Sequence, residues 1–112
     1  METPLPAANR LVISGSLNGA SEVRCSPAGL PIARFLLDHQ STQREAGIAR
    51  EARLRILVLA CGEDLAGKAA HLDSGTPVQV AGFLSRANNR HGEARLVLHA
   101  ESVELLDKSV HC

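Results

Sequence analysis

Arginine is the residue type in this chain that offers the clearest chemistry. Ten of the twelve basic residues are arginines. A guanidinium group is a planar fork that binds phosphate with two parallel hydrogen bonds and also stacks on flat rings. A GC-rich genome enriches arginine through its codons as well, so composition alone leaves two readings open: a phosphate-bearing ligand and a codon bias.

The arginines are unevenly distributed, although the chain as a whole has twelve basic and twelve acidic residues. Residues 24–55 contain six arginines against three acidic residues, and residues 86–95 contain three arginines against one glutamate. The other segments are net negative. Because a polyanion responds to local charge, two positive segments indicate a nucleic-acid partner. The alternative is a solvated surface on which neighbours such as Arg44–Glu45 and Arg50–Glu51 neutralise each other.

The cysteines, histidines and carboxylates form no recognisable catalytic or metal site. The five histidines lack metal-binding spacing, and no cysteine pair accompanies them, so we predict no metal, no cofactor and no catalytic residue. Cys61 precedes a helix-like segment, where a thiolate could be stabilised, but no base lies near it in the sequence. We expect Cys61 to be a small buried residue, and an enzyme that uses its thiol is the alternative.

Several protein classes are excluded by what the chain lacks. Three cysteines without paired spacing do not make a disulfide framework. There is no export signal and no apolar run of the roughly 20 residues that a membrane helix needs. We therefore expect a cytoplasmic protein with reduced thiols and no membrane partner. With two Phe, no Tyr and no Trp, few rings remain for stacking.

Five stretches have the alternation or the apolar runs that are typical of strands. They are Arg10–Leu17, Ile32–His39, Arg50–Ala60, Pro77–Ser85 and Arg95–Leu106. The first two are joined by a turn-rich loop at Ser26–Gly29, and the second and third by a polar connection at Gln40–Ala49. Apolar residues at helical spacing, after two acids, predict a short helix over Glu63–Leu72. We expect residues 1–8 to be a flexible lead, 9–107 to be the folded domain and 108–112 to fray.

Two details predict that the sheet closes on itself. Gly15 and Gly82 fall inside strands, where glycine permits sharp coiling. The apolar positions of the last strand change from even to odd, and a bulge near Glu101–Ser102 would turn Leu96, Leu98, Ala100, Val103 and Leu105 all inward. The predicted fold is an all-β, five-stranded Greek-key OB-fold barrel with one short helix between strands three and four. A flat sheet with flexible glycines is the alternative.

Several segments resemble the family of primosomal replication protein N, or PriB, which is related to single-stranded DNA-binding proteins. They are Asn9–Gly15, Ser26–Pro31, Phe35–His39, Gln43–Gly47 and Leu96–Asp107. The resemblance implies a homodimeric accessory protein, not an enzyme, that binds single-stranded DNA non-specifically. It also implies a role in replication restart, with the helicase PriA and the helicase-loading factor DnaT as partners. By the same resemblance, the dimer forms through the first strand, at Arg10, Leu11, Val12 and Ile13.

The two positive segments coincide with the two loops that flank the groove in this fold. The predicted DNA-binding residues are Arg24, Arg34, Arg44, Ile48, Arg50, Arg53, Arg55, Arg86, Asn88, Arg90, His91 and Arg95. Family members often carry aromatic residues where this chain has Ile48 and Arg53, so we expect weaker base stacking here, partly replaced by arginine. The family's lysines in the last loop are matched by Asn88, Arg90 and Arg95. A protein-interaction adaptor with weak or no DNA binding is the alternative function.

Overall fold

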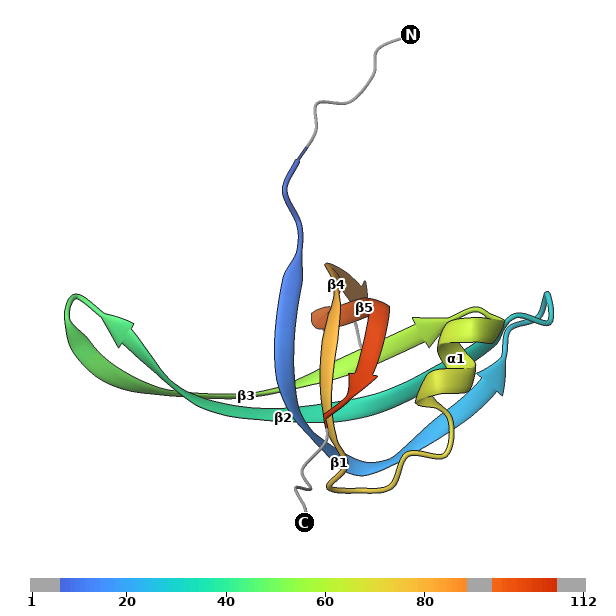
Figure 1. Cartoon of the computed structure of the whole chain (residues 1–112). Helices are drawn as coiled ribbons and strands as arrows, with labels where there is room; N and C mark the ends of the chain where they lie inside the picture. The colour runs from blue at the N-terminus through green and yellow to red at the C-terminus, as the bar shows by residue number, and fades with distance from the viewer. Residues whose placement is uncertain (1–6, 89–93, 107–112) are drawn as a thin grey trace, which may run out of the picture.

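The fold was derived from a computed structural model, which describes residues 7–88 and 94–106. Its elements are β1 (Leu11–Cys25), β2 (Pro31–Glu45), β3 (Ile48–Cys61), α1 (Glu63–Ala69), β4 (Pro77–Asn88) and β5 (Ala94–Leu105). The strands close into a barrel in the order β1-β2-β3-β5-β4 (Figure 1). The β3 and β5 strands run parallel, and the other neighbours are antiparallel. The predicted OB-fold barrel, with its helix between the third and fourth strands, is confirmed.

The barrel interior is aliphatic because alternate residues of each strand point inward. On β2, Ala33, Phe35 and Leu37 are buried, whereas Arg34 is exposed and Leu36 half-buried. The largest fully buried side chains in the described part of the chain are Leu37, Leu98, Val58, Val78, Val80 and Val97. The α1 helix adds Ala66 and Ala69 to this core. The alternation read from the sequence therefore separates the core from an outward-facing surface.

Glycine is required at two points where strands cross closely. A Cβ on Gly15 would collide with the carbonyl oxygen of Asp38, and a Cβ on Gly82 would collide with that of His99. Both glycines lie on strands that also pair on their other side. This close approach is the structural reason for the two in-strand glycines, and it agrees with the predicted closure.

The predicted bulge in β5 is confirmed at Glu101. Ala81 pairs with Ser102 and Gly82 with Ala100, so that Glu101 has no partner on β4. The predicted inward set is only partly right, because Leu96 and Leu105 are exposed. Leu96 opposes Arg86 where the β4–β5 hairpin extends past the last β3 partner of β5, so no interior remains for its side chain.

The first strand is longer than predicted, and the helix is shorter. The Asn18–Gly19 pair, which has the composition of a turn, lies in an irregularity within β1 rather than at its end. Ser21 lies in this irregularity and makes two hydrogen bonds with Leu72. The Ser21 N–H donates to the Leu72 carbonyl at 2.9 Å, and the Ser21 hydroxyl accepts from the Leu72 N–H at 3.0 Å. These bonds hold Leu72 on the core without helix, which explains why α1 ends at Ala69 instead of Leu72.

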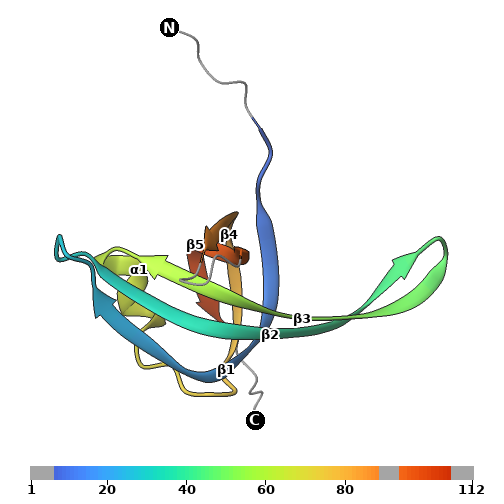
Figure 2. The same ribbon diagram turned by 180° about the vertical axis from the view of Figure 1, so that it is seen from behind.

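The predicted polar connection at Gln40–Ala49 is wrong. The β2 and β3 strands remain paired to Glu45 and Ile48, and a two-residue turn at Ala46–Gly47, both with positive φ, joins them. The result is an arm, Gln40–Arg53, that extends beyond the barrel on the side opposite α1 (Figures 1 and 2). None of its side chains is buried. Because both faces meet solvent, the sequence carries no alternation that would reveal these strands.

Candidate nucleic-acid interface

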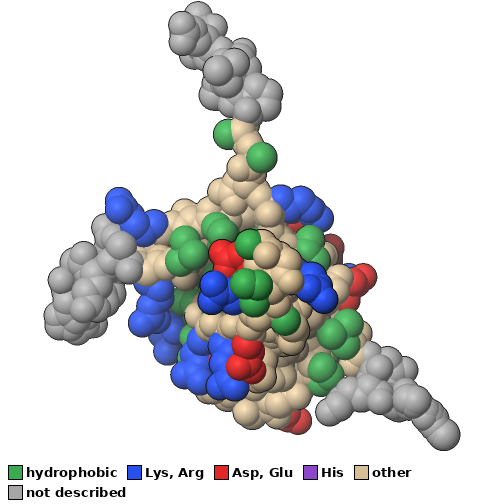
Figure 3. Space-filling model, turned by 90° about the vertical axis from the view of Figure 1, so that its left-hand side faces the viewer, with side chains coloured by type: hydrophobic (Ala, Val, Ile, Leu, Met, Phe, Trp, Pro, Cys, Tyr) green, Lys and Arg blue, Asp and Glu red, His purple; other side chains and the backbone are tan. Residues whose placement is uncertain are grey.

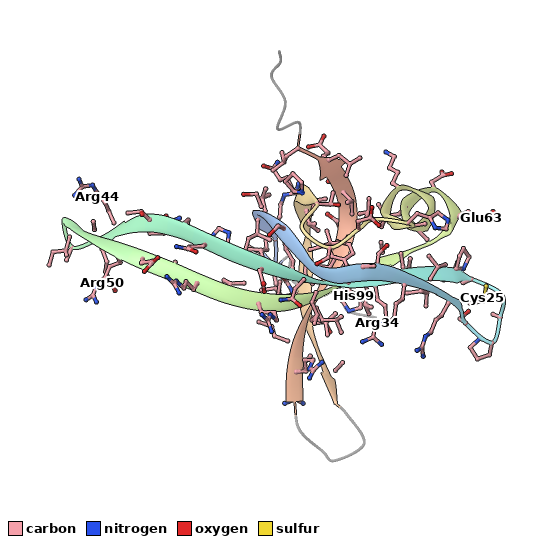
Figure 4. All side chains as sticks on the ribbon, turned by 90° about the horizontal axis from the view of Figure 1, so that it is seen from below. Cys25, Arg34, Arg44, Arg50, Glu63 and His99 are labelled. Carbon is pink, nitrogen blue, oxygen red and sulfur yellow. The ribbon has the colours of Figure 1, made fainter. Side chains whose placement is uncertain are left out.

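The arm carries three of the predicted DNA-binding arginines, on two different faces. Register pairs place Arg44 and Arg53 on one face, whereas Arg50 belongs to the other. Figure 4 shows Arg44 and Arg50 on opposite sides at the end of the arm. Ile48, at the tip, is 60% exposed. The arm therefore presents cations around its circumference rather than along one groove wall.

Each arginine of the arm already has an acceptor within the arm. Arg50 pairs with Glu45 at 3.1 Å and Arg53 with Glu51 at 3.1 Å. Arg44 donates to the Gly47 carbonyl at 3.0 Å. Glutamates therefore do neutralise arginines on the arm, but Glu45 pairs with Arg50 and not with its neighbour Arg44, and Glu51 pairs with Arg53 and not with its neighbour Arg50. Exposed pairs of this kind contribute about 0–1 kcal/mol, so a phosphate can displace the glutamate at little cost.

At the base of the arm, Arg55 is held by Asp38. The Arg55 Nε lies 2.6 Å from the Asp38 Oδ1, and the Asn18 amide donates to Asp38 Oδ2 at 2.9 Å. The hydrogen bond from Arg55, followed by that from Asn18, lowers the pKa of Asp38, and the hydrogen bond to Asp38 raises the pKa of Arg55. An open hollow of about 680 Å³ surrounds this pair, with Gln40 and Arg53 in its lining. Asp38 therefore fixes one cation at the edge of a groove.

Three other arginines make no hydrogen bond or ion pair with the residues that the structure describes; we call them the open arginines. They are Arg34 on β2, Arg86 on β4 and Arg95 on β5, and all three are exposed. Arg34 and Arg95 lie on the outer face, by which we mean the outward side of β2, β3, β5 and β4. Arg86 opposes Leu96 on the other side of the hairpin. Their charge is available without first breaking a pair.

Sequence reasoning missed an aromatic pair on the outer face. The rings of Phe83 and His99 are stacked, with centroids 5.0 Å apart and planes 12° from parallel. The two residues oppose each other across the β4–β5 hairpin, and Phe83 is 40% exposed. The available signal was that both residues have outward parity on two predicted strands that a hairpin joins. The chain thus has a flat apolar surface on the barrel. The positions at which family members often carry aromatic residues, Ile48 and Arg53, are instead on the arm.

A second hollow, of about 360 Å³, lies between β1 and the outward side of β2 and β3. Arg34, Leu36 and Leu57 line it from the sheet, and the irregular part of β1, Asn18–Glu22, lines it from the side. Both hollows open on outward residues of β2, which are Arg34 and Leu36 in one and Asp38 and Gln40 in the other. The two hollows therefore lie one after the other along β2, and the larger one is at the base of the arm.

The remaining predicted residues are placed elsewhere or are not placed. Arg24 lies near the end of β1 and is 3.8 Å from Glu22. Asn88 ends β4, with its side chain outside the described part, and Arg90 and His91 lie outside the described residues altogether. Among the predicted arginines that the structure describes, the strand registers therefore put two on the other side of the sheet, Arg50 and Arg86, and the rest on the outward side, which are Arg24, Arg34, Arg44, Arg53, Arg55 and Arg95.

Surface views agree with this division of charge. Figure 3 looks onto the end of the arm and shows most of the Lys and Arg side chains on the left of the view, with others on the right beside acidic side chains. Figure 4 shows Arg34 and His99 on one side of the β2–β3 ribbon, toward which the β4–β5 hairpin projects. Cationic and aromatic groups therefore share one side of the barrel.

The residues predicted for the dimer interface do not form one surface. Val12 is 52% exposed and Arg10 is exposed, whereas Ile13 is buried in the core and Leu11 packs against the core. Arg10 also pairs with Glu101 of β5 at 3.0 Å. An interface through the first strand would therefore use the outward Arg10 and Val12 rather than Ile13.

The expectation that Cys61 is buried is wrong. Cys61 is exposed at the end of β3, since it still pairs with Ile32 and the alternation that buries Ala60 turns Cys61 outward. Among residues 7–88 and 94–106, no three metal-binding side chains come together. In the same part of the chain, no helix has the length and apolar character needed to cross a membrane.

Comparison with known proteins identifies relatives of the whole domain. Residues 9–102 match a family described as another single-strand binding protein family. The chain is 42% identical over 100 residues to the replication restart protein PriB of Proteus mirabilis, which covers 89% of this chain and 95% of that protein. The PriB structure from Ralstonia solanacearum has a TM-score of 0.72 at 31% identity, covering 89% of this chain and all of that one. A single-stranded DNA-binding protein mutant from Thermus aquaticus has a TM-score of 0.74 at 25% identity, covering 90% of this chain and 51% of that one.

Proposed function

Because this chain belongs to the family of the replication restart protein PriB, within the single-strand binding proteins, we propose that it binds single-stranded DNA non-specifically and serves replication restart. The observation that carries this proposal is the outer face. There Arg34, Arg53 and Arg55 lie along two hollows, beside half-buried leucines. Such a groove neutralises backbone phosphates and offers apolar surface to any base.

The geometry favours a ligand without sequence preference. Guanidinium groups bind phosphate, which is the same at every nucleotide, and apolar side chains accept the flat face of every base. The paired arginines of the arm can exchange glutamate for phosphate as a strand passes, while the open arginines need no such exchange. The chain acts in this proposal as a binding protein and not as an enzyme.

We further propose that the chain is a homodimer and that it recruits or stimulates the helicase PriA, with the loading factor DnaT as a second partner. The exposed Val12 and Arg10 support a contact through the outward side of β1. A two-fold contact there would place two barrels side by side and lengthen the path available to DNA. The partner proteins come from the family resemblance.

A protein-interaction adaptor with weak DNA binding is the second candidate, and one observation favours it. Two of the arm's arginines, Arg50 and Arg53, are paired with glutamates, so the net charge of the arm is reduced. Alanine substitutions of Arg34 and Arg95, the open arginines of the outer face, separate the two functions. DNA binding predicts weaker oligonucleotide affinity for the variants, whereas the adaptor predicts little change.

Sedimentation velocity of the purified chain, with and without a 30-nucleotide oligo-dT strand, tests the proposal. We expect a dimer at micromolar concentration that moves together with the strand in low salt. A monomer would contradict the proposed dimer. Absence of co-sedimentation at low salt would contradict DNA binding and leave the adaptor as the better account.

A further inference from the structure

Four residues form a continuous row across the outer face of the barrel. Arg34 on β2 pairs with Leu59 on β3, Leu59 with His99 on β5, and His99 with Phe83 on β4. Directly paired residues point to the same side of a sheet, so all four side chains project outward. The row runs from an open cation, over a half-buried leucine, to two stacked rings.

The spacing of this row leaves room for one flat ring. Neighbouring strands are about 4.8 Å apart, so Arg34 and His99, which flank Leu59 from either side, are separated by about 9.6 Å at the backbone. A stacked base occupies about 3.4 Å along the stacking direction. A base that stands on Leu59 can therefore contact a side chain on each of its two faces.

We propose that this slot binds one nucleobase of single-stranded DNA, with the His99 ring stacked on one face and the Arg34 guanidinium on the other. Phe83 supports His99 from behind through the stack at 5.0 Å. The inference rests on the proposed DNA binding and deepens it, because it assigns the stacking contact to the barrel instead of the arm. Stacking by rings and guanidinium planes accepts any base.

The surroundings of the slot favour DNA over an apolar partner. Glu22, which faces Arg34 across β1 and β2, is 3.8 Å from Arg24, and Arg34 makes no ion pair within the described residues. The hollow of about 360 Å³ that Arg34 shares with Leu36 and Leu57 opens beside the slot and can receive a neighbouring nucleotide. A ligand with apolar faces and an anionic backbone complements both features.

The test compares two ligands of equal length, oligo-dT and an abasic deoxyribose-phosphate strand, by fluorescence anisotropy in the same buffer. We expect wild type to prefer oligo-dT. The His99→Ala variant should lose about 10-fold in affinity for oligo-dT, and Phe83→Leu, which keeps an apolar side chain without the ring, should lose less. Both variants should bind the abasic strand as wild type does. As a control, Leu105→Ala removes an exposed apolar side chain from β5, the strand that carries His99. This variant should bind both oligo-dT and the abasic ligand as wild type does.

One further variant and one further measurement keep the test decisive. His99→Phe preserves the ring and should retain the preference for oligo-dT, even if His99→Ala fails to fold. Equal loss on both ligands, or no preference in wild type, would overturn the slot while leaving phosphate binding intact. Failure of wild type to bind either strand would instead overturn the proposed function. A change in sedimenting mass of Phe83→Leu without DNA would assign the rings to a contact between copies, which also overturns the slot.

Discussion

The barrel and the arm are built from the same two strands but depend on different interactions. In the barrel, β2 contributes the fully or almost fully buried Ala33, Phe35 and Leu37, whereas no side chain from Gln40 to Arg53 is buried. A two-stranded ribbon without a core is only marginally stable by itself. Stability therefore resides in the barrel, and the arm adds charge and reach without contributing to the core.

The arginines of the two regions differ in the same way. Those of the arm have acceptors nearby, while Arg34, Arg86 and Arg95 on the barrel strands have none among the described residues. An arginine that must leave a glutamate to meet a phosphate gains less than one that is open. In the proposed DNA-binding function, the barrel face is therefore the principal contact and the arm the supplementary one.

The largest expected effect is on stability, from Leu37→Ala. Leu37 is completely buried on β2, so its truncation leaves a cavity and should lower the free energy of unfolding by about 2–5 kcal/mol. Ile48→Ala, at the exposed tip of the arm, is the matched control and should cost less than about 1 kcal/mol. Urea denaturation measures both. Similar losses for the two variants would refute the division between barrel and arm.

The next effect concerns DNA affinity. Replacing the two open arginines of the outer face, Arg34 and Arg95, together by alanine should make the slope of log affinity against log salt shallower by about 1.4, because two phosphate contacts are lost. Replacing Arg44 and Arg50 of the arm together removes the same charge but should change the slope by less than about 0.7, since Arg50 starts from an ion pair with Glu45 and Arg44 from a hydrogen bond to the Gly47 carbonyl. Anisotropy titrations of oligo-dT at four salt concentrations give both slopes. A larger effect of the arm variant would reverse the assignment.

A smaller, stabilising effect is expected from Ala46→Gly at the arm's turn. Ala46 has a φ of 52°, a conformation that costs alanine more than glycine. The substitution should stabilise the closed arm by about 0.5–1 kcal/mol. Hydrogen exchange should slow at the arm amides of Gln43 and Arg50, which face each other in a hydrogen-bonded pair next to the two-residue turn, and remain unchanged in the core. Uniform slowing across the barrel would show that arm and barrel unfold as one unit.

The smallest effect is the pH dependence contributed by Asp38. Its pKa is lowered in the folded protein by the hydrogen bonds from Arg55 and Asn18, so this stabilisation is complete above the ordinary value of 3.8 and is lost as the pH falls through the lower folded value. The wild-type urea midpoint should therefore decline more steeply below about pH 4 than that of Asp38→Asn. Parallel curves for the two proteins would contradict the assigned pairing.

The barrel could be predicted from the sequence because its signals are local. Alternating apolar residues gave the five strands, and the parity change in the last strand located the bulge at Glu101. In-strand glycines indicated closure because only glycine tolerates the approach of the Asp38 and His99 carbonyls. These features follow from which residues a small closed sheet must bury.

The arm and the details of the site could not be predicted in this way. Strands exposed on both faces carry no alternation, so Gln40–Glu45 resembled a loop. Ion pairs such as Arg50 with Glu45 depend on the register and the turn, which periodicity does not fix. The Phe83–His99 stack depends on the pairing of two strands, which a count of aromatic residues does not reveal. Long-range register is thus the missing information.

The most direct test of the central claim is the affinity of the wild-type chain for oligo-dT as a function of salt. If the outer face neutralises at least three phosphates, log affinity falls linearly with log salt with a slope of about −2 or steeper. Affinity that does not change with ionic strength, or no measurable binding at the lowest salt, would contradict an electrostatic groove for single-stranded DNA on this barrel.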